Sequence, residues 1–149
     1  MKIDRKQDLL WWRSIFNAVI ILWTFTLSPS NAMPKPVCSH GGEVQSKVEL
    51  FFGLAIPGGG KVDSAAWQEF LEQEVTSRFP DGLTVDQVEG QWQDAKTGKI
   101  IQESSRVVMI VYTASPEADK NIEEIREAYQ SKFDQQSVMR LDEINCVRF

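Results

Sequence analysis

Two segments with helical periodicity separate four segments of strand character, and this order restricts the possible folds more than any other feature of the sequence. In residues 47–57, KVELFFGLAIP, apolar side chains recur at every second position, which predicts a strand. In residues 64–79 and 116–133 they recur at three- and four-residue spacing, which predicts two amphipathic helices. The remaining strands are predicted at 83–93, 99–113 and 137–149.

Capping and turn residues mark the ends of these segments. Asp63 or Ser64 can cap the first helix, and Ser115, with proline next to it, can cap the second. FPDG at 79–82 stops the first helix in the order of residues that a type I turn favours. DAKTG at 94–98 predicts a hairpin between the two middle strands.

The resulting order is strand, helix, strand, strand, helix, strand. This is the split βαβ arrangement of ferredoxin-like α+β folds. We expect one four-stranded antiparallel sheet, in the order 4-1-3-2, with both helices on one face. Such a fold leaves the other face of the sheet without a cover from residues 47–149.

The residues before this domain have the layout of an export signal. Lys2, Arg5, Lys6 and Arg13 precede an apolar run, and SPSNA follows with small residues spaced as before a cleavage site, so we expect residues 1–32 to be a signal peptide. The run of 14 apolar residues is short for a bilayer core, which leaves an uncleaved inner-membrane anchor as the alternative. Residues 33–46 are predicted to be a flexible lead-in, because they are polar and rich in Pro and Gly.

Two cysteines follow the signal, Cys38 and Cys146. In an oxidising compartment they are expected to form a disulfide. The predicted topology places the start of the first strand and the end of the last at the same edge, so Cys38 can fold back to meet Cys146. A metal site at Cys38 and His40 is the competing interpretation, but two ligands do not complete a tetrahedral set.

Charge excludes two classes of partner. The leader holds four of the 16 basic and two of the 21 acidic side chains, so the rest of the chain carries a net charge of −7. Nucleic acid needs a basic face, and no cluster of Lys or Arg is present. The same charge opposes docking on anionic lipid once the signal is cleaved.

The glycines at 58–60, followed by Lys61, resemble a phosphate-binding loop but lack its anchors. A Walker loop needs a glycine where Ala55 stands and a hydroxyl where Val62 stands. We therefore read this stretch as a connector into the first helix, with a weaker possibility that Lys61 holds a small anion. No cofactor and no metal is predicted.

The uncovered sheet face is the predicted working surface. Pairing the hairpin around DAKTG places Leu83, Val85, Val107, Met109 and Val111 under the helices. The residues then expected on the open face are Thr84, Asp86, Val88, Trp92, Ile100, Arg106, Val108, Ile110 and Tyr112, with Phe51 and Ala55 from the first strand. Asp86 and Arg106 are expected to pair.

Apolar patches of this kind usually bind a partner or a ligand. Phe51, Val108, Ile110 and Tyr112 are the candidate interface of a homodimer. A small-molecule cleft and a monomer with an aromatic face are the alternatives.

The polar candidates for ligand binding are Arg78, Gln91, Trp92, Glu103 and Arg140. For Arg78, a structural role at the end of the first helix competes with anion capture. A Ser-His triad is excluded, because the single histidine lies in the lead-in. Glu89 and Glu103 can face each other on the hairpin, but carboxylates at its wet end stay ionised, so no catalytic residue is assigned.

The blocks VTSRFPDGLTV and GQW, an ESS tract and the closing QQSVMR and CVRF resemble a family of small exported bacterial proteins known only as a domain of unknown function. The resemblance covers about residues 48–149. It implies a bacterial, extracytoplasmic protein, often lipid-anchored in relatives. This chain departs from that habit, because Lys35, Pro36 and Val37 precede Cys38, where a lipid site needs small apolar residues. The family implies no activity.

Two functions remain for the chain. The first is an exported, non-catalytic module of the bacterial envelope, periplasmic or extracellular, that binds a partner or dimerises through its open sheet face. The second is a small-molecule-binding protein or enzyme of the dimeric ferredoxin-like barrel kind, with its pocket lined by the polar candidates. The fold favours neither.

Overall fold

The computed structural model describes residues 37–148. The predicted signal peptide and residues 33–36 of the predicted lead-in lie outside them. The elements are β1 (Glu43–Gly53), α1 (Ser64–Phe70), a π-helical continuation η2 (Leu71–Thr76), β2 (Thr84–Gln93), β3 (Ile100–Tyr112), α2 (Pro116–Phe133) and β4 (Met139–Val147), with a short 3-10 turn η1 (Ser39–Gly41) before β1. Among the described residues, no helix is long and apolar enough to cross a membrane.

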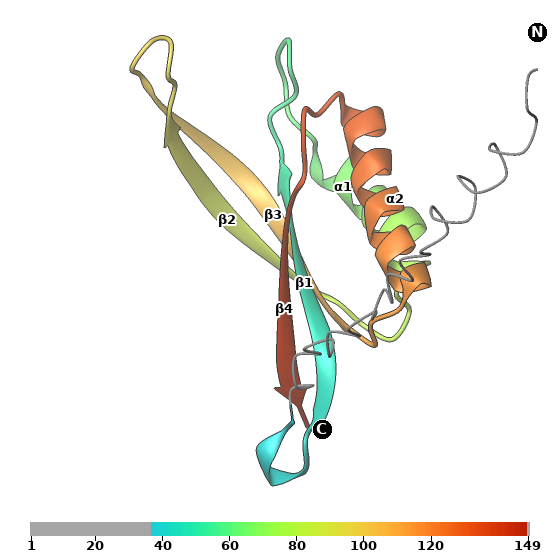
Figure 1. The fold of residues 1–149 in the computed structure, drawn as a ribbon. Coiled ribbons are helices and arrows are strands. Elements are labelled where there is room, and N and C mark those ends of the chain that lie inside the picture. Colours follow the sequence, from blue (N-terminus) through green and yellow to red (C-terminus); the bar gives the residue numbers. More distant parts are fainter. Residues whose placement is uncertain (1–36, 149) are drawn as a thin grey trace, which may run out of the picture. The chain divides into compact units, whose positions relative to one another are not determined.

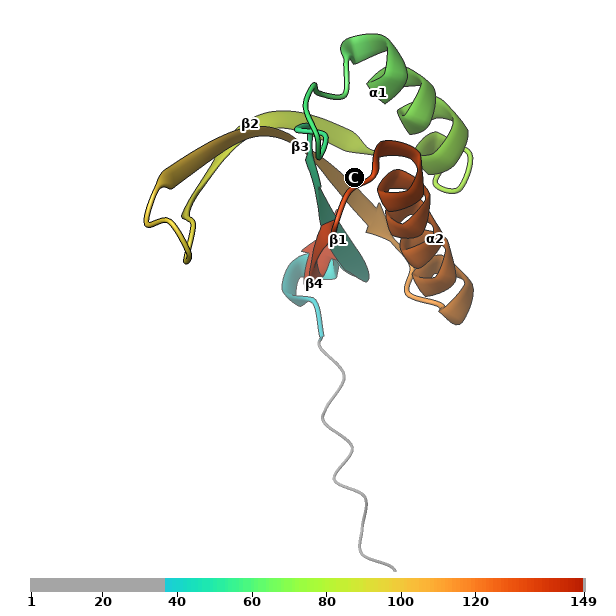
Figure 2. The same ribbon diagram turned by 90° about the horizontal axis from the view of Figure 1, so that it is seen from above.

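The sheet confirms the predicted α+β topology. Its order is β2-β3-β1-β4 and all three pairings are antiparallel. Figure 1 shows β1 and β4 side by side in the centre and the β2–β3 hairpin reaching away from the helices. Figure 2 shows α1 and α2 on one side of the sheet only.

Helix boundaries follow the predicted caps. The Asp63 side chain accepts a hydrogen bond from the N–H of Ala66, and the Ser115 side chain accepts one from the N–H of Ala118. Pro116 occupies the first helical position of α2, where its missing N–H costs nothing. The helix α2 ends at Asp134, which has φ 52°, the left-handed conformation that often closes helices.

The core lies between the sheet and the two helices. Phe52 of β1 makes edge-to-face contacts with Trp67, Phe70 and Tyr129, with ring centroids 4.7–5.7 Å apart. Such pairs add about 0.5–1.5 kcal/mol each beyond the area they bury. The buried aliphatic residues around this cluster are Val48, Leu50, Leu54, Val62, Val75, Val108, Ile110, Ile122, Ile125 and Val138.

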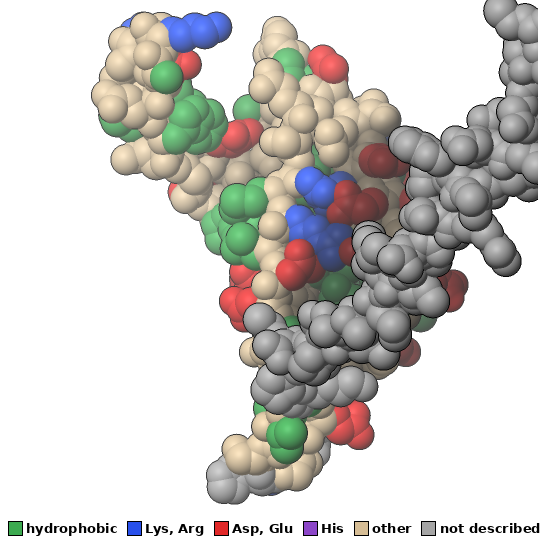
Figure 3. Space-filling model, viewed as in Figure 1, with side chains coloured by type: hydrophobic (Ala, Val, Ile, Leu, Met, Phe, Trp, Pro, Cys, Tyr) green, Lys and Arg blue, Asp and Glu red, His purple; other side chains and the backbone are tan. Residues whose placement is uncertain are grey.

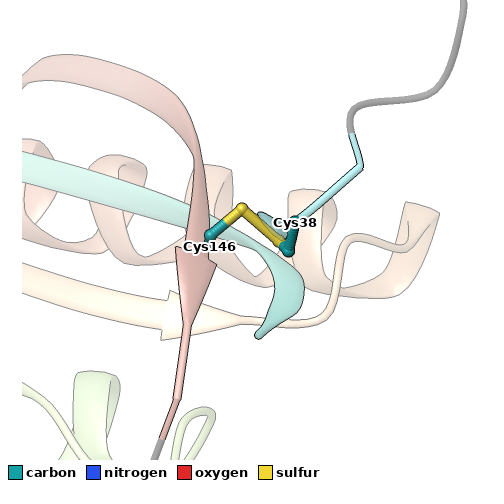
Figure 4. Close-up of a disulfide and its surroundings, with 2 residues drawn as sticks. All are labelled: Cys38 and Cys146. Atoms are coloured by element: carbon teal, nitrogen blue, oxygen red, sulfur yellow. A yellow bond between two sulfur atoms is a disulfide. The ribbon is translucent and has the colours of Figure 1, made fainter. Parts of the chain in front are cut away.

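The predicted disulfide is present. The sulfur atoms of Cys38 and Cys146 are bonded, with the Cα atoms 5.5 Å apart across a sequence separation of 108 residues (Figure 4). The bond excludes a metal-binding thiolate at Cys38, so the competing interpretation with His40 is wrong. Within residues 37–148, no cluster of three His, Cys, Asp or Glu side chains could hold a metal ion.

β1 begins at Glu43, four residues before the predicted strand. Val44 pairs with Cys146 and Glu43 with Val147. Part of the predicted lead-in is therefore strand, because the disulfide and β4 hold it in the sheet.

The side chains of β3 point the opposite way from the prediction. Val85 pairs with Val108, and Trp92 pairs with Ile101, whereas the predicted pairing is shifted by one residue. A one-residue shift exchanges the two faces of a strand. Val108 and Ile110 are consequently buried under the helices and not exposed on the open face.

Arg106 and Tyr112 also lie on the helix-facing side of β3. Arg106 pairs in the sheet with Gln87 and not with Asp86, whose partner is Val107. Tyr112 packs its ring against Phe79 with centroids 5.8 Å apart. The predicted Asp86–Arg106 pair and the open-face position of Tyr112 are therefore wrong. Val107, Met109 and Val111 take the open-face positions instead.

Candidate functional site

The open face, which we define as the side of the sheet opposite α1 and α2, carries apolar side chains from all four strands. The register places Phe51 beside Val107 of β3 and Met139 of β4. Several members are strongly exposed: Trp92 by 48%, Met139 by 51% and Leu141 by 45%. The apolar members of the open face are Phe51, Val88, Trp92, Ile101, Val107, Met109, Val111, Met139 and Leu141.

Figure 3 shows hydrophobic side chains gathered on the β2–β3 hairpin and over the side of the molecule away from the helices, with basic side chains at the hairpin tip. The hairpin tip is held by two backbone hydrogen bonds: the N–H of Asp94 donates to the carbonyl of Lys99, and the N–H of Gly98 donates to the carbonyl of Asp94. Figure 2 shows that this hairpin curves away from the helices as it leaves the sheet. The open face is therefore concave along the hairpin.

A groove of about 740 Å³ lies in this concave part. Its apolar lining includes Phe51, Trp92, Ile101 and Met139, and its formally charged lining residue is Glu103. Two of the predicted ligand-binding residues, Trp92 and Glu103, thus come together at one site.

Glu103 holds the end of β1 in the groove. Its Oε1 accepts a hydrogen bond of 3.0 Å from the N–H of Ala55. A Cβ on Gly53 would lie 2.6 Å from the same oxygen, so the carboxylate sits against β1 where only glycine leaves room. This carboxylate ties the end of β1 to β3.

The opposite side of the same strand end is held by Tyr129. Its hydroxyl donates to the carbonyl of Gly53 over 2.8 Å. Burial raises the pKa of the Tyr129 hydroxyl well above its ordinary value, and the charge of Glu103 raises it further. The hydroxyl is therefore neutral and remains a donor at physiological pH.

Arg78 lies at the end of η2, away from the groove. Its Nη1 donates to the Glu74 carbonyl and to the Glu74 carboxylate, each at 2.8 Å, and its Nε lies 3.3 Å from the Glu124 carboxylate. These contacts satisfy a helix-end carbonyl and join the first helix to α2. The structural interpretation of Arg78 is thus the one that its contacts match.

Arg140 lies on the helix-facing side of β4. Its guanidinium contacts the carboxylates of Asp142, Glu123 and Asp119 at 2.7–3.0 Å, and its side chain is 18% exposed. Burial alone would lower the pKa of Arg140, but the hydrogen bonds to these carboxylates outweigh it and raise the pKa. This network joins β4 to α2.

Gln91 lies on the exposed hairpin, where its Oε1 accepts a hydrogen bond of 2.8 Å from Gln102. Arg78, Gln91 and Arg140 are therefore not brought together with Trp92 and Glu103.

The sequence reasoning missed the contribution of β4 to the open face. Met139 and Leu141 alternate with Val138 and Arg140, and this alternation was the available signal. The pairing of Met139 with Phe51 places it next to the groove.

Residues 47–149 match the model of a family described as Protein of unknown function (DUF3574). The chain belongs to this family. No curated protein matches it. Two solved structures of a phage SAM lyase are similar in fold. The complex with S-methyl-5′-thioadenosine has a TM-score of 0.52 and 13% identity, and the match covers 75% of this chain and 95% of the lyase. The apo state has a TM-score of 0.53 and 14% identity, and the match covers 73% of this chain and 87% of the lyase.

CutA from Synechococcus elongatus PCC7942 is a more distant neighbour, with TM-score 0.47 and 9% identity over 71% of this chain and 81% of that one. At these identities the likeness to the lyases establishes the fold alone, and the likeness to CutA carries no argument. Family membership likewise brings no activity to this chain.

Proposed function

We propose that the domain is an exported, non-catalytic module that pairs with a second copy of itself through its open face. The observation that carries this proposal is the apolar set on that face, which extends over all four strands and includes three large side chains exposed by 45–51%. Apolar patches of this extent usually mark an interaction surface.

The size of the face fits a dimer. Strands of 9–13 residues at about 3.3 Å per residue are about 30–40 Å long, and four strands about 4.8 Å apart span about 19 Å. The footprint is then roughly 600–800 Å², near the roughly 800 Å² per partner of a standard interface.

Charged side chains also lie on the open face, and they have partners. Lys47 of the inner strand β1 contacts Glu49 at 3.1 Å and Glu143 at 2.9 Å, so two of these three charges offset each other and one negative charge remains. At the groove end, Glu103 accepts a hydrogen bond from the backbone of Ala55. Export is supported by the disulfide, since such bonds persist in oxidising compartments.

Light scattering on the exported protein tests the proposal, with one variant on each side of β4. Leu141→Glu places a charge on the open face and is expected to convert the dimer to a monomer. Ile144→Glu is the matched control, because Ile144 is 66% exposed and lies on the other side of the strand, and it should leave the dimer intact. A wild-type protein that is monomeric at about 100 μM, where even a weak interface of micromolar affinity would be filled, would overturn the proposal.

A second candidate is a small-molecule site in the groove. It is favoured by the meeting of Trp92 and Glu103 in a hollow of about 740 Å³, a volume typical of ligand sites. A phage lyase of this fold holds S-methyl-5′-thioadenosine, which makes that compound a reasonable first probe. The candidate predicts a thermal shift with it that Trp92→Ala abolishes. An unchanged unfolding temperature at millimolar S-methyl-5′-thioadenosine would exclude the groove as a site for compounds of that kind.

A further inference from the structure

A second hollow, which we call the Arg106 pocket, lies on the helix-facing side of the sheet. It has a volume of about 370 Å³ and shares no lining residue with the groove of the open face. Its walls come from the end of β1 with the following loop, from α1, and from β2 and β3. The lining residues are Leu54, Lys61, Val62, Asp63, Ser64, Trp67, Gln87, Ser104 and Arg106.

Arg106 is the charged residue that the sheet contributes to this pocket. It lies in a row of helix-facing side chains, between Phe52 of β1 and Gln87 of β2. Its Nη1 donates to the Oε1 of Gln87 at 3.0 Å, and its Nε is buried without an acceptor. No carboxylate of residues 37–148 lies within ion-pair distance of it.

A partly buried charge without a counterion is unfavourable. The bond to Gln87 uses one side of the guanidinium and leaves Nε and Nη2, the two nitrogens that bind both oxygens of a carboxylate. Two unpaired nitrogens therefore remain on the edge that is suited to an oxyanion, and one of them, Nε, is closed off from solvent.

The other polar groups of the pocket set its balance of charge. Lys61 is exposed and makes no ion pair in the described part of the chain. The Oδ1 of Asp63 is occupied as the cap of α1, at 2.9 Å from the Ala66 nitrogen. Ser104 donates its hydroxyl to Glu89 at 2.7 Å. The lining therefore carries two cations and one carboxylate, and Glu89 stands next to it.

The glycine-rich loop positions Lys61. The N–H of Val62 donates to the carbonyl of Leu54 at 2.8 Å, and the N–H of Ile56 donates to the carbonyl of Gly60 at 3.1 Å. Gly58, Gly59 and Gly60 all have positive φ, which side chains with a Cβ rarely adopt. The loop is thus a tight hairpin that returns the chain to β1 and brings Lys61 to the mouth of the pocket.

We propose that the Arg106 pocket binds a small organic carboxylate with an apolar body. Arg106 would hold the carboxylate through Nη2, and through Nε once the guanidinium turns to expose that buried nitrogen, and Lys61 would neutralise it from the mouth. Leu54, Val62 and Trp67 form the apolar wall that contacts the body. A single negative charge is preferred over a phosphate dianion, because Asp63 and Glu89 are near enough to oppose a second one.

The volume also limits the ligand. About 370 Å³ lies at the lower end of the range for small-molecule sites, which suits a ligand of the size of benzoate. The pocket shares no lining residue with the groove of the open face, so this inference can be tested independently of the proposed dimer.

An NMR titration of the exported protein with benzoate tests the inference. The indole N–H signal of Trp67 and the Nε–H signal of Arg106 report on the pocket directly. Both are expected to shift and saturate with a dissociation constant of about 0.1–1 mM, the range of a small ligand held by one ion pair. Benzamide, the neutral analogue, should bind at least about tenfold more weakly if the charge is recognised. Phenyl phosphate should also bind more weakly than benzoate.

Three variants complete the experiment. Arg106→Gln is expected to reduce benzoate affinity at least tenfold, and Lys61→Gln to reduce it about threefold, since a more exposed charge contributes less. Lys120→Gln, which removes a lysine from the far end of α2, is the control and should change nothing. If Arg106→Gln does not fold, the comparison of benzoate with benzamide on the wild-type protein still decides.

The inference is overturned if benzoate does not shift the Trp67 signal, if benzamide binds as well as benzoate, or if Arg106→Gln binds benzoate as the wild type does. Tighter binding of phenyl phosphate than of benzoate would overturn the choice of a carboxylate.

Discussion

The hydroxyl of Tyr129, near the C-terminal end of α2, donates a hydrogen bond of 2.8 Å to the carbonyl of Gly53, the last residue of β1. The bond crosses the core and joins two residues that are 76 positions apart. On the other side of the same strand end, Glu103 accepts from the Ala55 N–H. The end of β1 is therefore fixed from both faces of the sheet, next to the groove of the open face.

Tyr129→Phe is expected to destabilise the domain by about 1–2 kcal/mol, because the Gly53 carbonyl loses its donor in a buried setting. Urea unfolding followed by circular dichroism measures the effect. Gln91→Ala, which removes a hydrogen bond on the exposed hairpin, is the control and should cost less than about 0.5 kcal/mol. Equal losses of unfolding free energy in the two variants would contradict a stabilising role for the Tyr129 hydrogen bond.

The same hydroxyl predicts how stability depends on alkaline pH. Burial raises the pKa of Tyr129 above its ordinary value of 10.0, so the unfolded chain loses this proton at a lower pH than the folded one. The resulting stability is fully present below about pH 10 and is lost as the pH rises further. Wild-type stability measured from pH 8 to 11 should therefore fall above pH 10. Tyr129→Phe should show a smaller fall, and an equal slope in both proteins would disprove the linkage.

Gly53→Ala tests the close approach of Glu103. The added Cβ would lie 2.6 Å from the carboxylate oxygen, so the side chain must move and give up its bond to Ala55, at a cost of about 1 kcal/mol. In a Glu103→Ala background the same substitution should cost much less, and a double-mutant cycle gives the coupling. Gly90→Ala is the matched control, because the nearest atom there is at an ordinary 3.6 Å. Additive losses at positions 53 and 103 would rule out the contact.

Loss of the disulfide is expected to cost about 2–5 kcal/mol, since the bond closes a loop of roughly 100 residues in the unfolded chain. The double variant Cys38→Ser with Cys146→Ser measures this by thermal or urea unfolding. Reductant should destabilise the wild type to the level of the variant and leave the variant unchanged. If the wild-type protein keeps its full stability after both cysteines have been shown to be reduced, this expectation is wrong.

Much of the fold followed from local patterns. Period-2 and period-3.6 segments in a fixed order, with caps at Asp63 and Ser115, predicted the elements, and the handedness of crossovers then predicted the sheet order and the meeting of Cys38 with Cys146. These inferences succeeded because each depends on backbone geometry that neighbouring residues determine.

The facing of β3 could not be predicted in this way. Residues 107–112, VVMIVY, are apolar at every position, so the sequence does not show which of them face the helices. The hairpin decides this, because Asp94 and Lys99 close its turn and Trp92 pairs with Ile101. A shift of one residue there moved Val108 and Ile110 from the open face to the core.

The amino-acid sequence by itself determined the order of strands and helices, the acidic charge and the partner of each cysteine, because these depend on composition and on short-range periodicity. Only the tertiary structure decided which charges have partners. Arg140 is neutralised by Asp119 and Glu123 of α2, while no carboxylate of residues 37–148 lies within ion-pair distance of Arg106. Such partners come from elements distant in sequence, so packing of the helices on the sheet gives Arg140 its carboxylates and leaves Arg106 without one among the described residues.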